Sequence, residues 1–228
     1  MAISSDNTFD AGTATLPRLE DEIANSITHG IGLALSLVGA AALVIAAART
    51  ADTREFVGCL IYGLSLVAVY AASTLSHVFW QPRLRRVFRM LDQGCIYLLI
   101  AGTFTPLALR YLRDGWWWVL LATMWTIAVV GFCSKVFLAH RVEAVSTAAY
   151  VVMGWLPVLA AKPMIAVTPG RCLWMMFAGG LCYTVGTLFL TFDRKALYLH
   201  AVWHIFVIAG SAVHYFAILE YALPGATV

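Results

Sequence analysis

Three histidines lie in one apolar run of membrane-spanning length, Tyr198 to Leu219: they are His200, His204 and His214. An ionisable or metal-binding side chain is costly in hydrocarbon unless it has a partner, so each of the three is a candidate functional residue. His200 and His204 are four residues apart, so a helix carries both imidazoles on one face, and helical zinc motifs use this spacing to hold one ion. The alternative interpretation is that these histidines only pack or form hydrogen bonds between helices.

Three more polar residues are expected at the same membrane depth. Ser73 and His77 stand one helical turn apart near the end of the second apolar run, and Asp92 stands at the beginning of the third. If every run crosses the bilayer as a helix, the end of the second run and the beginnings of the third and seventh lie on one side. His77, Asp92 and His200 then share a layer, and His204 lies one turn, ~5.4 Å, deeper than His200. Histidines that only stabilise separate helix contacts would not be expected to lie in one membrane layer.

Three imidazoles, from His77, His200 and His204, would leave the fourth position of a tetrahedral metal for water, as in an open catalytic zinc site. Nitrogen ligands with a nearby carboxylate suit zinc best. Asp92 could orient or deprotonate that water, because the HAVWH segment lacks the Glu of soluble zinc proteases. Ser73 could donate to a carbonyl or to the water. The alternatives are an Asp favoured by the helix dipole and a Ser bonded to its own backbone.

Other polar residues are not expected to bind the metal directly. Glu22, Asn25 and His29 share one helix face and could contact the metal ligands from outside, or could line a wet interface. His214 lies ten residues past His204, ~15 Å further along the axis. We therefore expect His214 to form a hydrogen bond between helices, and we expect His140 to be solvated in a short loop.

The composition requires a membrane environment. Of the 228 residues, 61% are hydrophobic and 12% are charged, and the mean hydropathy is +0.82. These values exclude an ordinary soluble domain. The net charge of +3 is not gathered into a basic face, so no nucleic-acid partner is predicted. The five cysteines form no CxxC pair and are expected as buried apolar residues.

Seven apolar runs approach the ~20 residues that cross ~30 Å of hydrocarbon as a helix. They lie at about Ile27–Ala48, Phe56–Trp80, Leu91–Leu109, Trp116–Leu138, Val145–Ala161, Cys172–Phe192 and Leu197–Leu219. The fifth is short and ends at Lys162 and Pro163. The prediction is an all-α protein: a mobile polar arm over residues 1–19, followed by one seven-helix transmembrane domain over residues 20–228.

The positive charges predict how the bundle is oriented. With seven spans, one side carries nine Lys and Arg residues, namely Arg18, Arg83, Arg85, Arg86, Arg89, Lys135, Arg141, Arg194 and Lys195. The other side carries six, namely Arg49, Arg54, Arg110, Arg113, Lys162 and Arg171. The positive-inside rule therefore places the N-terminus in the cytoplasm and the C-terminus outside.

Four stretches together resemble the hemolysin III family, which is similar to the adiponectin and progestin receptors and more distantly to the alkaline ceramidases. They are EIANSITHGIG at Glu22 to Gly32, STLSH at Ser73 to His77, LDQGCIYLLIAGTFTP at Leu91 to Pro106, and HAVWHIFVIAGSAVHYFAI at His200 to Ile218. The resemblance covers nearly the whole chain after the arm.

This resemblance implies a seven-helix protein of the bacterial inner membrane with zinc near the cytoplasmic face, held at His77, His200 and His204. The Ser and Asp of the family pattern fall on Ser73 and Asp92.

Three functions remain open at this point. The first is a zinc hydrolase of lipid-like amides or esters whose substrate enters from the bilayer, and it is favoured by the open metal position beside a carboxylate. The second is a receptor or sensor in which zinc is structural. The third is a cytolytic pore, which would need a polar lining along its whole length.

Overall fold

The computed structural model describes residues 18–112, 117–138, 146–193 and 195–223, and this part of the chain is helical without any strand. Its helices are α1 (Leu19–Ala48), α2 (Thr53–Val78), α3 (Pro82–Tyr111), α4 (Trp117–Phe137), α5 (Ser146–Trp155), α6 (Ala161–Val167), α7 (Gly170–Thr191) and α8 (Leu199–Tyr221), with the 3₁₀ helix η1 (Leu156–Ala160) between α5 and α6. Seven helical segments are long and apolar enough to cross a membrane, which confirms the predicted fold class.

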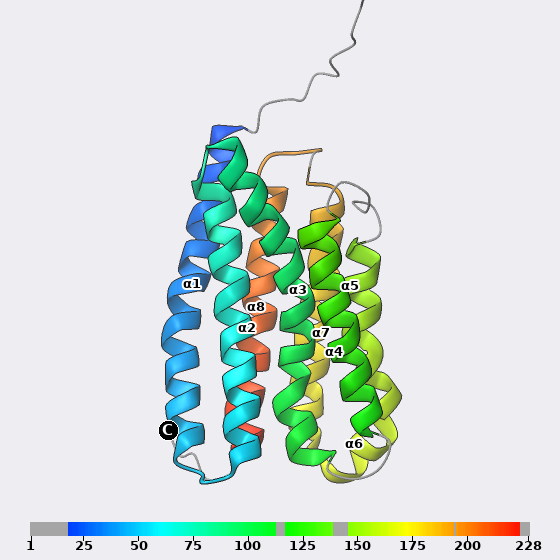
Figure 1. The fold of residues 1–228 in the computed structure, drawn as a ribbon. Coiled ribbons are helices and arrows are strands. Elements are labelled where there is room, and N and C mark those ends of the chain that lie inside the picture. The colour runs from blue at the N-terminus through cyan, green and yellow to red at the C-terminus, as the bar shows by residue number, and fades with distance from the viewer. Residues whose placement is uncertain (1–17, 113–116, 139–145, 194, 224–228) are drawn as a thin grey trace, which may run out of the picture.

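The helices form a bundle in which α1, α2 and α8 lie together and α3 stands between them and α4 (Figure 1). Consecutive helices α1 and α2, α2 and α3, α3 and α4, and α7 and α8 have the most extensive contacts. The first and last helices, α1 and α8, also contact each other. Residues from the two ends of the sequence are thereby brought to one end of the bundle.

Close helix contacts depend on small residues, as is usual in membranes, where apolar burial gives little drive for association. Gly58 of α2 shows this: an added Cβ would lie 2.9 Å from the Cα of Pro106 in α3. Large apolar side chains point outward instead. Val38 is 73% exposed and Trp174 is 71% exposed, as expected for surfaces that face lipid.

The third helix begins earlier than predicted. The sequence placed its start at Leu91, but α3 begins at Pro82, which occupies the first helical turn as proline does best. Hydropathy assigned the arginine-rich stretch to a loop because it is polar, although it contains no helix breaker after Pro82. Asp92 therefore lies about three turns inside α3, and the interpretation of Asp92 as a helix-start residue is wrong.

The fifth span is also longer than predicted. It was expected to end at Ala161, before Lys162 and Pro163, but the helical path continues through η1 and α6 to Val167. Pro163 lies in the first turn of α6, where its missing N–H costs no helical hydrogen bond. Of the predicted mobile arm, residues 1–17 lie outside the described part of the chain, and α1 begins at Leu19.

Candidate metal centre

Three histidines from two helices converge at one end of the bundle. His77 is in the last turn of α2, His200 is in the first turn of α8, and His204 follows one turn later. One ring nitrogen from each lies within 4.8 Å of the others. The ring centroids are 5.3 Å apart for His77 with either of the other two and 4.6 Å apart for His200 with His204. The three histidines singled out from the sequence therefore lie close together, and the group could hold a metal ion.

Two of the three imidazoles have a carboxylate behind them. His77 Nδ1 is 2.8 Å from Glu22 Oε2, and His200 Nδ1 is 3.1 Å from Asp193 Oδ2. A carboxylate is an acceptor, so each Nδ1 carries the proton and the lone pair is left on Nε2.

The third imidazole has a hydroxyl behind it. His204 Nδ1 is 3.1 Å from Thr28 Oγ1. The Thr28 hydroxyl donates its own proton to the Ala24 carbonyl at 2.9 Å, so it accepts from His204. All three rings are therefore held in one tautomer, with Nε2 free to bind a metal.

This donor set fits a tetrahedral divalent metal. Metal-bound histidines usually donate the other ring nitrogen to a carboxylate, carbonyl or water, as these three rings do. The Nε2 atom of His77 is buried and has no hydrogen-bond partner among the described residues. Histidine nitrogens bind zinc at about 2.0–2.1 Å, so an ion would draw the three nitrogens closer than 4.8 Å.

Glu22 joins the metal centre to the beginning of α3. Its side chain is 6% exposed, one oxygen contacts His77, and the other forms an ion pair with Arg85 and lies 3.8 Å from Arg89. A buried carboxylate is tolerated when such partners compensate its charge. Glu22 of α1 therefore links His77 of α2 to Arg85 of α3.

His29 forms a wall of the centre. Its ring stacks on His204 with centroids 3.4 Å apart and an interplanar angle of 18°, and it meets Tyr70 edge-on at 5.1 Å. Neither ring nitrogen of His29 has a hydrogen-bond partner among the described residues. His29 thus packs against one histidine of the group without belonging to it.

Two further polar residues come from α2 and α3. Ser73 is in α2, one turn before His77, and Asp92 is in α3. The Asp92 carboxylate interacts electrostatically with His200 and approaches the Ser73 hydroxyl. The hydroxyl is buried, and it makes no hydrogen bond of regular geometry with any described residue. The alternative interpretation, in which Ser73 is bonded to its own helix backbone, is therefore not observed. The Asp92 carboxylate therefore stands near His200, and the Ser73 hydroxyl stands one helical turn from His77.

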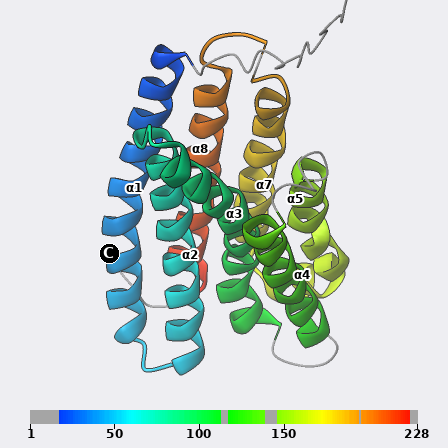
Figure 2. The same cartoon turned by 45° about the horizontal axis from the view of Figure 1, so that its top comes forward.

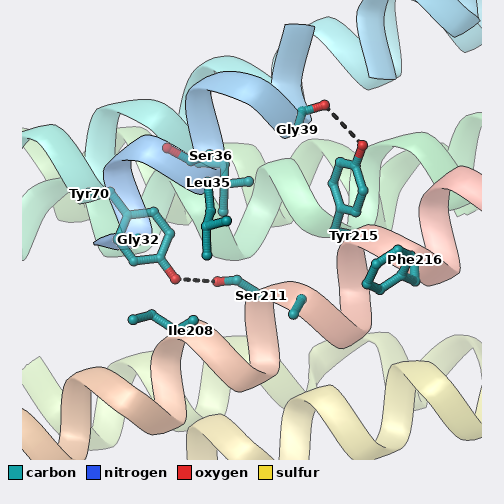
Figure 3. A pocket seen from close by; sticks show the side chains of 11 residues that line it. Gly32, Leu35, Ser36, Gly39, Tyr70, Ile208, Ser211, Tyr215 and Phe216 are labelled. Atoms are coloured by element: carbon teal, nitrogen blue, oxygen red, sulfur yellow. Dashed lines mark hydrogen bonds between the residues drawn. The ribbon is translucent and has the colours of Figure 1, made fainter. Parts of the chain in front are cut away.

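An apolar groove begins at Ile208, one helical turn after His204. Figure 3 shows the side chains that line it. It has a volume of about 220 Å³ and lies between α1, α2 and α8. Tyr70 and Ser211 form a polar point in it, where the Tyr70 hydroxyl donates to Ser211 Oγ at 3.0 Å. Leu35 is 60% exposed and Phe216 is 56% exposed, so the groove opens toward the surrounding lipid.

The other histidines do not join the centre. His214 is buried, and its Nε2 donates to the Met176 carbonyl of α7 at 3.0 Å, which is the expected hydrogen bond between helices. His140 lies outside the described residues.

Sequence reasoning missed the contacts of Thr28, Arg85 and Asp193. The available signals were weak: Thr28 stands beside His29, and Asp193 stands seven residues before His200.

Comparison with known proteins confirms the family resemblance given by the sequence. Residues 18–215 match the family described as Haemolysin-III related. "Hemolysin-3" of Bacillus cereus is 41% identical over 209 residues, which cover 92% of this chain and 95% of the relative. The "Hemolysin-3 homolog" of Bacillus subtilis (strain 168) is 38% identical over 205 residues, 90% of this chain and 96% of the relative.

A human protein is also similar. "Monocyte to macrophage differentiation factor" of Homo sapiens is 34% identical over 217 residues, which cover 90% of this chain and 86% of the relative. Seven apolar helices together with these matches indicate a multi-pass integral membrane protein, for which a bacterial inner membrane is a consistent location. The chain belongs to the haemolysin-III-related family of membrane proteins.

Proposed function

We propose that this protein is a zinc-dependent membrane hydrolase of lipid-like amides or esters, with zinc held by His77, His200 and His204. The observation that carries the proposal is the set of three imidazoles whose Nδ1 atoms all meet acceptors, beside a carboxylate that is not one of those acceptors. A purely structural zinc site needs four protein ligands and no adjacent base. Three histidine ligands leave one position for chemistry.

Each residue has a defined task in this proposal. A zinc ion at this position supplies a Lewis acid that acidifies water and polarises a carbonyl group. Asp92 accepts a proton from the attacking water as the new C–O bond forms, and returns it to the amine or alcohol as the scissile bond breaks. Ser73 donates a hydrogen bond to the carbonyl oxygen as negative charge develops on it.

The groove between α1, α2 and α8 supports a lipid-like substrate. It is apolar, it opens toward the bilayer, and Ile208 on its wall is one turn from His204. A lipid whose alkyl chain lies in the groove would place its amide or ester group near the metal centre. Substrate would then enter laterally from the membrane rather than from water.

The orientation is part of the same proposal. Four arginines lie in the first turns of α3, at the end of the bundle that carries the histidines. The positive-inside rule therefore favours a cytoplasmic metal centre and N-terminus, with the C-terminus outside.

A second candidate is a receptor or sensor in which the metal only ties α2 to α8. The ion pair of Glu22 with Arg85 favours it, because this pair links the same centre to α3 and could transmit a change in metal occupancy. A cytolytic pore has less support. Within the described residues the space between the helices is filled by buried side chains such as Tyr62, Phe104 and Leu107, where a pore needs a continuous polar lining.

The test compares wild-type protein with Asp92→Asn over a panel of ceramides and phospholipids, with zinc quantified in both. Asn fills the same volume and leaves the three imidazoles in place, so zinc content should stay at the wild-type level. Hydrolysis should fall by ~10²–10⁴, because an amide cannot accept the proton. Wild-type turnover by a zinc-replete Asp92→Asn protein would remove Asp92 from the reaction. Absence of wild-type activity across the panel would favour the receptor.

A further inference from the structure

The beginning of α3 differs from every other membrane helix of the described chain in its density of positive charge. Four arginines, Arg83, Arg85, Arg86 and Arg89, fall within seven residues. Arg85 is largely buried against Glu22, whereas Arg83, Arg86 and Arg89 are exposed. In Figures 1 and 2 this part of α3 lies beside α1. The ion pair of Arg85 with Glu22 joins it to the first turns of α1, at the end of the bundle that carries His77 and His200.

Few acidic groups face these arginines. Glu22 is already engaged by His77 and Arg85. Asp21 accepts from the Tyr198 backbone N–H at 2.8 Å, on the α8 side of α1. Glu20 is exposed and forms no ion pair with Arg83 or Arg86 among the described residues. The four arginines therefore outnumber these three acidic residues of α1 by one, and Arg83 and Arg86 form no ion pair with any of the three.

A second groove lies directly beside the arginines. It has a volume of about 180 Å³ and separates α1 from the end of α2. Leu19, Ile23 and Ile27 form one wall, since a spacing of four residues places them in one stripe on α1. Val78 and Trp80 form the other wall, and Glu22, Ser26 and His77 also line the groove. Each of the five apolar side chains is about half exposed, so the groove opens sideways toward lipid.

One contact joins the apolar groove to the basic surface. The Arg85 guanidinium lies 5.8 Å from the centroid of the Trp80 ring, within the range of a cation–π interaction. Trp80 belongs to the connection between α2 and α3, and tryptophan is enriched at the membrane interface. The rim of the groove is thus at the depth of lipid headgroups, with the arginines above it and the apolar walls below.

We propose that this corner is a binding site for one anionic phospholipid, with the phosphate on the exposed arginines of α3 and an acyl chain in the groove between α1 and α2. Arginine clusters next to a membrane helix attract anionic lipids by about 1 kcal/mol per residue. The apolar walls of the groove can hold an acyl chain, which a lipid has and a free phosphate lacks. This site does not depend on the proposed hydrolysis, because lipid binding needs no reaction, although Glu22 and His77 of the metal centre also line the groove.

The test measures lipid binding directly. Delipidated protein in neutral detergent is titrated with phosphatidylglycerol or phosphatidylcholine of identical acyl chains, and bound lipid is counted by native mass spectrometry. Wild-type protein should bind phosphatidylglycerol at least about 30-fold more tightly than phosphatidylcholine. The double variant Arg83→Gln/Arg86→Gln should lose about 30-fold in that affinity, from about 1 kcal/mol per arginine. Both residues are exposed and neither contacts the histidines.

Matched variants separate the explanations. Arg49→Gln/Arg54→Gln removes two exposed arginines from the opposite end of the bundle and should leave phosphatidylglycerol binding unchanged. Arg83→Lys/Arg86→Lys keeps the charge and should retain most of the binding. Ile23→Trp fills the groove and should weaken binding of the lipid with the arginines intact.

Several results would overturn the proposal. They are equal binding of both lipids by wild-type protein, an equal loss in the control at Arg49 and Arg54, and unaltered binding in Arg83→Gln/Arg86→Gln. Displacement of phosphatidylglycerol by millimolar inorganic phosphate would show an anion site without a lipid groove, which also contradicts it.

Discussion

The substitution Glu22→Gln tests whether the buried carboxylate behind His77 tunes the metal centre. Glu22 uses both oxygens, one for His77 at 2.8 Å and one for Arg85. Gln has the same shape but offers one oxygen and one NH₂ group. If its oxygen faces His77, its NH₂ group meets the Arg85 guanidinium, donor against donor. If its oxygen faces Arg85, the His77 Nδ1–H loses its acceptor.

The expected magnitude follows from that geometry. Loss of a hydrogen-bonded partner behind a metal-bound histidine typically lowers metal affinity by 10–100-fold, which is about 1.4–2.7 kcal/mol. The assay is competition for zinc between the purified protein and a chelator of known affinity, below the melting temperature of both proteins. We expect the dissociation constant for zinc to rise by that factor in Glu22→Gln, with the stoichiometry unchanged at saturation.

A matched control lies at the other end of the bundle. Glu55 is as buried as Glu22, and it forms an ion pair with Arg110 at 3.1 Å. Glu55→Gln makes the same chemical change in a buried Glu–Arg pair, so it should lower thermal stability without changing zinc affinity. If Glu22→Gln binds zinc as tightly as wild type, or if Glu55→Gln weakens zinc equally, the assignment of Glu22 as a partner of a metal ligand is wrong.

Two further predictions concern the metal ligands and the topology. Purified protein should hold about one zinc per chain, and alanine at His77, His200 or His204 should remove most of it, because two imidazoles leave an ion under-coordinated. Zinc measured by elemental analysis should stay near the wild-type level in His214→Ala, and an equal loss there would contradict the ligand set. Reporter fusions at Val228 and between α2 and α3 should report opposite sides of the membrane. If both fusions report the same side, the count of seven spans is wrong.

Much of the site was readable from sequence because its signals are local. The spacing of His200 and His204 fixes a common helix face, and the alternation of apolar runs fixes the direction of each span. Seven spans then place His77 at the same end as the other two histidines. No contact between distant residues had to be known for this step.

The limits of hydropathy explain the two errors in helix bounds. The start of α3 is polar because its arginines lie at the membrane edge, yet the backbone there is as helical as in the apolar part. In the fifth span Lys162 and Pro163 were interpreted as the end, although Pro163 lies in the first turn of α6. A hydropathy profile locates the segments that are apolar enough to lie in the hydrocarbon of the membrane. A helix, in contrast, ends where its backbone hydrogen bonds end.

The sequence by itself determined that this is a membrane protein with seven apolar segments and three histidines at one end of them. Only the tertiary structure decided which acceptors hold those histidines, namely Glu22, Thr28 and Asp193. The reason is physical: helix periodicity and hydropathy are properties of neighbouring residues, but a hydrogen bond across helices depends on the rotation and closeness of segments separated by up to 176 positions.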